Sequence, residues 1–76
     1  MPRIVPLHWR DLEQVFLRAG CRFARQEGGH RSHVKEGSPR PIVVPAHGMV
    51  PVSIIRNNLK TAGLSREEYF CRLESK

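Results

Sequence analysis

The stretch that decides the fold is GCRFARQEGGH, residues 20–30. Gly20 is typical of the residue that ends a helix, because glycine tolerates the left-handed backbone found there. Residues 21–26 alternate loosely, as a strand does. The glycine pair near the end of the stretch signals a tight turn, so residues 30–35 are expected to form a second strand. This stretch therefore predicts the end of a helix followed by a β-hairpin.

A helix is expected before this stretch. Residues 1–6 contain two prolines and are expected to form an extended lead-in. From Leu7 onward, apolar residues recur at helical spacing and mark one buried stripe. The stripe consists of Trp9, Leu12, Val15, Phe16 and Ala19. We expect a helix of about three turns that ends at Gly20.

A third strand and two helices are expected after the hairpin. Residues 41–45 are a β-branched run closed by proline, which is typical of a short strand. Pro51 opens a helix, since proline is tolerated in the first turn, and Gly63 ends it. Ser65 and Glu68 then form a capping-box pattern that starts a short terminal helix.

These elements predict an α+β fold with the order α-β-β-β-α and a short C-terminal helix. Each of the two main helices has one apolar stripe, so both need a partner that covers it. A three-stranded antiparallel sheet with the helices on one face meets that need, with Phe23 as the expected core residue of the first strand. The other sheet face is left in contact with water. We expect a single domain over residues 1–76, because a chain of 76 residues leaves nothing for a second core.

The sequence is strongly basic. Its 13 Lys and Arg residues against 7 Asp and Glu residues give a net charge of +6 and a pI of about 10.4. This charge favours a polyanionic partner, either a nucleic acid or an acidic protein, although a merely soluble basic surface is the alternative. Charge alone does not separate RNA from DNA, or binding from cleavage.

Nothing in the sequence indicates export or membrane insertion. The first residues lack the apolar run of a signal peptide, and no segment approaches the ~20 apolar residues that a membrane span needs. The 2 cysteines are too sparse for a disulfide scaffold and are expected to be reduced thiols. We therefore expect a cytoplasmic protein with no membrane partner.

Three segments of the sequence resemble the HicA family of toxin–antitoxin systems. They are residues 20–30, the VPAH of residues 44–47 and the AGLSREEY of residues 62–69. The resemblance implies a double-stranded-RNA-binding-like fold, an mRNA-cleaving toxin (mRNA interferase) and a cognate HicB antitoxin. It also implies that His30, the histidine after the glycine pair, is the catalytic residue. Cys21 and His33 depart from the family pattern, which commonly has phenylalanine and tyrosine there.

His30 suits RNA cleavage on chemical grounds. It follows Gly28 and Gly29, whose backbone can turn sharply and leave the imidazole exposed at a strand start. The 2′-hydroxyl of RNA can attack the adjacent phosphate, so the protein has to supply proton transfer and charge stabilisation, and imidazole suits the first task. One alternative is a non-catalytic RNA-binding module with the same fold. Another is a protein that only binds an acidic protein partner.

Five basic residues are expected around the sheet: Arg22, Arg25, Arg31, Lys35 and Arg40. With Gly28 and Gly29 they would contact RNA and hold its phosphates; the alternative is a solvated strand face. His47 would flank the same site or serve as a loop hydrogen-bonding residue. His30 and His33 should point to opposite faces of a regular strand, which disfavours a shared metal site. We expect no metal and no other cofactor.

The partners follow from the resemblance and the charge. The toxin alone is expected to be monomeric and to act on mRNA. Its antitoxin is expected to be acidic, because opposite potentials speed and orient association, and to inhibit by covering His30.

Overall fold

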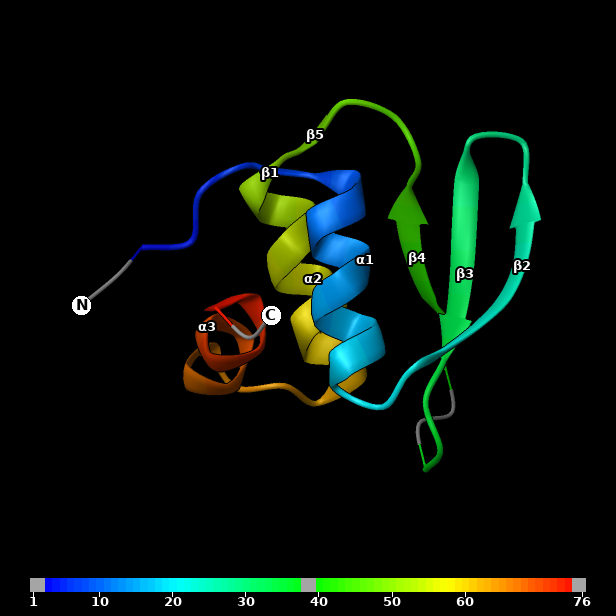
Figure 1. The fold of residues 1–76 in the computed structure, drawn as a ribbon. Coiled ribbons are helices and arrows are strands. Elements are labelled where there is room, and N and C mark those ends of the chain that lie inside the picture. The colour runs from blue at the N-terminus through cyan, green and yellow to red at the C-terminus, as the bar shows by residue number, and fades with distance from the viewer. Residues whose placement is uncertain (1–2, 38–39, 75–76) are drawn as a thin grey trace.

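The computed structural model describes residues 3–37 and 40–74, drawn as a ribbon in Figure 1. In chain order the elements are β1 (Leu7–His8), α1 (Trp9–Arg18), β2 (Arg22–Glu27), β3 (His30–Val34), β4 (Ile42–Pro45), β5 (Met49–Val50), α2 (Val52–Ala62) and α3 (Arg66–Glu74). The predicted helices and the three predicted strands are confirmed, with bounds shifted by a residue or two. The predicted lead-in falls partly on residues 1–2, outside the described residues, and residues 3–6 form no helix or strand.

The structure has two layers (Figure 1). One layer is the antiparallel sheet β2-β3-β4, with β3 in the centre. The other contains α1 and α2, which cover one face of the sheet, called here the inner face. No helix of the described residues covers the opposite face, called here the outer face. The predicted α+β architecture, with its helices on one face, is confirmed.

A second, two-stranded sheet was not expected from the sequence. Leu7 pairs with Val50 and His8 with Met49, so β1 and β5 tie the start of α1 to the start of α2. The backbone N–H of Trp9 extends this link to the carbonyl of Gly48, with an N to O distance of 3.1 Å. Strands of two residues are too short to show a period-2 pattern, so the sequence contains no signal for them.

The hydrophobic core lies between the sheet and the helices. It takes residues from every layer, and all of them are at least 90% buried: Leu12, Val15, Phe16, Cys21, Ile42, Val44, Val50, Ile55, Leu59, Ala62, Leu64 and Tyr69. The apolar stripe predicted on α1 is confirmed, with Trp9 and Ala19 partly buried at its margin. Cys21, one of the two departures from the family pattern, is a core residue, and burial raises the pKa of its thiol.

The prediction that Phe23 is a core residue is wrong. Its side chain is 45% exposed, because β2 is an edge strand and all six of its residues are exposed. One face of the ring is instead covered by the guanidinium of Arg31, whose Cζ lies 4.2 Å from the ring centroid. The aromatic ring therefore makes a cation–π contact at the edge of the inner face rather than filling the core.

The helix ends are formed by the residues that the sequence singles out. Gly63 ends α2 with a φ of 70°, a left-handed conformation that favours glycine. The capping box is confirmed: the Glu68 N–H donates to Ser65 Oγ at 3.1 Å, and the Ser65 N–H donates to Glu68 Oε1 at 3.2 Å. α3 then packs beside α1, where Arg18 donates to the carbonyl of Arg72. None of the helices in residues 3–37 and 40–74 is long and apolar enough to cross a membrane.

Candidate functional site

The β2–β3 turn places His30 at the first position of β3. Glu27 pairs with His30, so Gly28 and Gly29 are the two central residues of the hairpin turn. Gly28 has a φ of 58°, whereas Gly29 has no positive φ, an arrangement that requires glycine at the first central position. The side chain of His30 is exposed. The turn thus leaves the imidazole open to solvent, as the sequence predicts.

The strand register assigns the side chains of β3 to the two faces. Arg31 pairs with Val44 and His33 with Ile42, and both partners are fully buried under the helices. Arg31 and His33 therefore lie on the inner face. His30 alternates with Arg31 and lies on the outer face, so the prediction that His30 and His33 point to opposite faces is confirmed.

Two of the predicted RNA-binding arginines share the outer face with His30. Arg22 pairs with Val34 and Arg25 with Ser32, and these partners alternate with the inner-face residues of β3. A register shift between Phe23 and Arg25 makes this possible. In a regular strand, residues 22 and 25 would point to opposite faces, and the bulge returns them to the same one.

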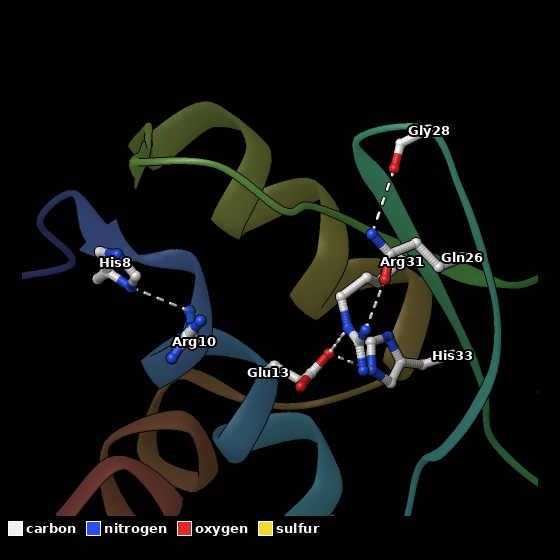
Figure 2. Close-up of polar contacts among 7 residues, drawn as sticks. All are labelled: His8, Arg10, Glu13, Gln26, Gly28, Arg31 and His33. Atoms are coloured by element: carbon white, nitrogen blue, oxygen red, sulfur yellow. Dashed lines mark hydrogen bonds and ion pairs between the residues drawn. The ribbon is translucent and has the colours of Figure 1, made fainter.

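Arg31 is separated from the other predicted RNA-binding residues. On the inner face its Nε donates to Glu13 Oε2 of α1, and its Nη1 donates to Gln26 Oε1 at 2.8 Å. Figure 2 shows Glu13 reaching from α1 toward Arg31 and His33 together. The Arg31 Cζ also lies 5.8 Å from the centroid of the Trp9 ring, in addition to its contact with Phe23. Arg31 is part of the contact between α1 and the sheet.

His33 completes this inner-face cluster. It is fully buried, and its Nε2 lies 3.1 Å from Glu13 Oε2. A carboxylate can only accept, so Nε2 donates to Glu13. Nδ1 has no hydrogen-bond partner among the described residues. The Glu13–Arg31–His33 cluster is thus a buried polar contact that pins β3 to α1.

The sequence does contain a signal for this cluster. Glu13 stands four residues after Trp9 and three before Phe16, so it falls within the apolar stripe of α1. A carboxylate in such a stripe needs a buried cationic or hydrogen-bonding partner, because an unpaired buried charge is costly. Its partners come from a strand nearly twenty residues away, and that pairing cannot be read from helix periodicity.

α1 itself begins one residue after His8, which caps it. His8 Nδ1 accepts from the backbone N–H of Arg10 at 3.3 Å, as Figure 2 shows. This contact satisfies one of the N–H groups that a helix start leaves without an intrahelical partner. His8 is therefore a structural residue at the start of α1.

His47 lies against the turn that carries His30. The Ala46 N–H donates to the carbonyl of Gly29 at 2.6 Å, which extends the pairing of β3 with β4 beyond Pro45. A Cβ atom built on Gly29 would lie 3.6 Å from Cδ2 of the His47 ring. The structure therefore brings the exposed His47 next to the residue that precedes His30.

Lys35 lies at the opposite end of the hairpin. Its Nζ donates to the carbonyl of Ala62 at the end of α2, at 2.9 Å. Its charge also opposes the rise in the pKa of the Cys21 thiol that burial causes. Within residues 3–37 and 40–74, no three His, Cys, Asp or Glu side chains are placed to hold a metal ion.

A comparison of the chain with protein families finds a match. A family model described as the HicA toxin of bacterial toxin–antitoxin systems covers residues 9–64. The chain belongs to the HicA toxin family. None of the curated proteins searched matches the chain. The matched residues run from the start of α1 to just beyond the end of α2, so they include His30 and the Glu13–Arg31–His33 cluster but not α3.

Membership of the HicA toxin family establishes the general role of this protein. It is a toxin of a bacterial toxin–antitoxin system, and such a system pairs the toxin with a cognate antitoxin.

Proposed function

We propose that this HicA toxin is an RNA endonuclease that cleaves mRNA in the cytoplasm by histidine acid–base catalysis. The observation that carries the proposal is the position of His30. It is exposed at the start of β3, on the sheet face that no described helix covers, and Arg25 and Arg22 lie further along the same face. A polyanion can therefore reach an imidazole and cationic side chains from one direction.

The chemistry needs the 2′-hydroxyl of the RNA as nucleophile, a base that accepts its proton and an acid that protonates the leaving oxygen. The 2′-oxygen attacks the adjacent phosphorus, its proton passes to a base, and the 5′-oxygen leaves with a proton from an acid. The products are a 2′,3′-cyclic phosphate and a 5′-hydroxyl. We assign one of the two proton transfers to the His30 imidazole. We assign to Arg25, which lies closer along the hairpin to His30 than Arg22 does, the stabilisation of the additional negative charge on the phosphate in the transition state.

The positions of the cations refine their proposed roles. Arg22, Arg25 and Lys35 contact RNA phosphates, and the turn glycines allow the RNA backbone to approach closely. Arg25 is offset in part by Glu27, which it pairs with at 2.8 Å on the exposed strand. Arg31 is engaged by Glu13 and Gln26, so we assign it to the support of β3 rather than to RNA contact. His47 adds a further polar side chain beside the β2–β3 turn that precedes His30.

The nature of the RNA ends tests this proposal. Purified toxin incubated with mRNA should generate fragments with 5′-hydroxyl ends, and their partners should carry 2′,3′-cyclic or 3′-phosphates. An otherwise identical RNA with a 2′-deoxynucleotide at the cleaved position should stay intact at that position, because the nucleophile has been removed. Binding without any cleavage would instead identify a non-catalytic RNA-binding module.

Cleavage should also survive chelation of divalent ions. The proposed reaction uses the 2′-hydroxyl and an imidazole, and no step calls for a metal-bound water. We expect the rate in excess EDTA to stay within about twofold of the untreated rate at matched ionic strength. Ionic strength has to be matched because salt changes RNA affinity. Complete loss of activity that added Mg²⁺ or Zn²⁺ restores would contradict the proposed mechanism.

The cognate antitoxin is proposed to be an acidic HicB-type protein that covers His30. A negative partner suits a toxin with a net charge of +6, and a partner on the outer face would compete with RNA for the same arginines. Diethyl pyrocarbonate should modify His30 in the toxin alone and leave it unmodified in the complex. His8, which is exposed at the start of α1, is the internal control. An inhibited complex in which His30 stays fully reactive would rule out inhibition by coverage.

A further inference from the structure

A cleft lies at the end of the hairpin that is far from His30. Its volume is about 500 Å³, and its lining comes from the loop before β2, the start of β2 and the end of β3: Gly20, Arg22, Val34, Lys35 and Glu36. Arg22 pairs with Val34 at this end, whereas Glu27 pairs with His30 at the other. The cleft and the proposed catalytic residue are thus at opposite ends of one pair of strands.

The two ends are within reach of one short piece of RNA. Val34 is the last residue of β3 and His30 the first, and four steps of a strand span about 13 Å. Arg22 lies on the outer face, as His30 does, and Arg25 lies between them. An RNA strand that runs along the outer face from His30 therefore passes Arg25 and arrives at the cleft.

The charges of the cleft favour a phosphate group. Arg22 is exposed and forms no ion pair with any described residue, so its guanidinium can donate two parallel hydrogen bonds to phosphate oxygens. Lys35 gives one of its three donors to the carbonyl of Ala62, which fixes its position and leaves two donors. Glu36, also exposed, is the opposing charge in the lining. Two cations and one carboxylate leave the cleft with a net positive charge.

We propose that this cleft is a second phosphate subsite, which holds a backbone phosphate of the RNA a few nucleotides from the bond cleaved at His30. The inference rests on the proposed function for the identity of its ligand, single-stranded RNA. It adds a length requirement: an RNA that reaches only His30 and Arg25 lacks the contacts with Arg22 and Lys35. It also gives Glu36 a role, because this carboxylate weakens the binding of a phosphate in the cleft.

A length series tests the subsite directly by binding. The His30→Ala toxin is titrated with labelled single-stranded oligoribonucleotides that grow by one nucleotide at a time, each at several salt concentrations. Affinity should rise by about three- to tenfold at the length that first reaches the cleft. At the same length, the slope of log affinity against log salt concentration should steepen by about 0.7 for one additional phosphate contact.

Three substitutions in the same background identify the residues responsible. Arg22→Ala should remove both the rise in affinity and the change in slope. Glu36→Gln should change affinity in the opposite direction and enlarge the rise, because it removes a repulsive charge from the cleft. Arg56→Ala removes one exposed charge from α2, in the other layer, and should leave the rise in place. Circular dichroism checks that each variant is folded.

The outcomes separate this inference from the proposed function. The subsite is refuted if no length gives a rise, if the rise persists in Arg22→Ala, or if Arg56→Ala removes it equally. If the His30→Ala toxin shows the rise in affinity but the parent toxin cleaves no RNA, the endonuclease is refuted and the subsite stands. If the parent toxin cleaves RNA but the His30→Ala toxin shows no rise, the subsite is refuted and the endonuclease stands.

Discussion

The His30→Ala toxin should cleave RNA about a hundred- to ten-thousandfold more slowly than the parent, which is the range that general acid–base catalysis contributes. The imidazole is exposed, and none of the polar contacts described above involves it, so its removal should alter neither the core nor the hairpin. The turn before it depends on the backbone of Gly28 and not on the His30 side chain. The loss should therefore appear in the rate of cleavage, with little change in stability or in RNA affinity.

The measurement is a single-turnover cleavage assay with toxin in excess over a labelled RNA, which separates chemistry from product release. Fluorescence anisotropy at equal salt gives the affinity, and thermal unfolding gives the stability. His8→Asn is the matched control, because it removes an exposed histidine outside the hairpin and retains a side chain that can cap α1. A His30→Ala toxin that cleaves RNA at close to the parent rate would show that another group performs the proton transfer.

The sequence predicts the fold well where the chain has a strong period or a strong stop. α1 and α2 have clear apolar stripes that end at glycines, and α3 begins with a capping box that the structure shows bond by bond. The β1–β5 pair has no such signal, because each strand is only two residues long. Phe23 was predicted to be a core residue, but its side chain is exposed. Burial of an apolar residue in a strand here requires a helix over it, and the position of the helix depends on tertiary packing.

The candidate site was also predictable only where local sequence signals determine it. The position of His30 follows from the local sequence, since a glycine turn fixes where the strand begins. The distribution of the cations follows from register. Alternation along β3 separates Arg31 from His30, and a bulge in β2 brings Arg22 and Arg25 to one face. The bulge lies next to Ala24, and neither its position nor its effect can be derived from residue types alone.

Replacement of Glu13 by alanine should cost the toxin about 3 kcal/mol of folding free energy. The Glu13 carboxylate accepts hydrogen bonds from both Arg31 and His33, and its side chain is 12% exposed. Without it, Gln26 is the one hydrogen-bonding partner that residues 3–37 and 40–74 offer the Arg31 guanidinium. Among the same residues, the fully buried imidazole of His33 then has no partner at either nitrogen. A domain of this size has little stability to spare, so the melting temperature should fall by more than about 10 °C.

Two variants make this prediction specific to the cluster. Glu67→Ala is the same substitution at an exposed position in the first turn of α3, and it should cost no more than about 0.5 kcal/mol. Glu13→Gln retains an amide oxygen that can accept from one of the two partners but removes the charge. Its loss of folding free energy should therefore lie between those of Glu13→Ala and Glu67→Ala. Urea unfolding gives the three free energies, provided that the slopes agree. Equal losses for Glu13→Ala and Glu67→Ala would mean that the contact between α1 and β3 contributes nothing to stability. A graded loss would show that Glu13 stabilises the contact between α1 and β3. His30 is the first residue of β3, and its side chain lies on the sheet face opposite to this contact.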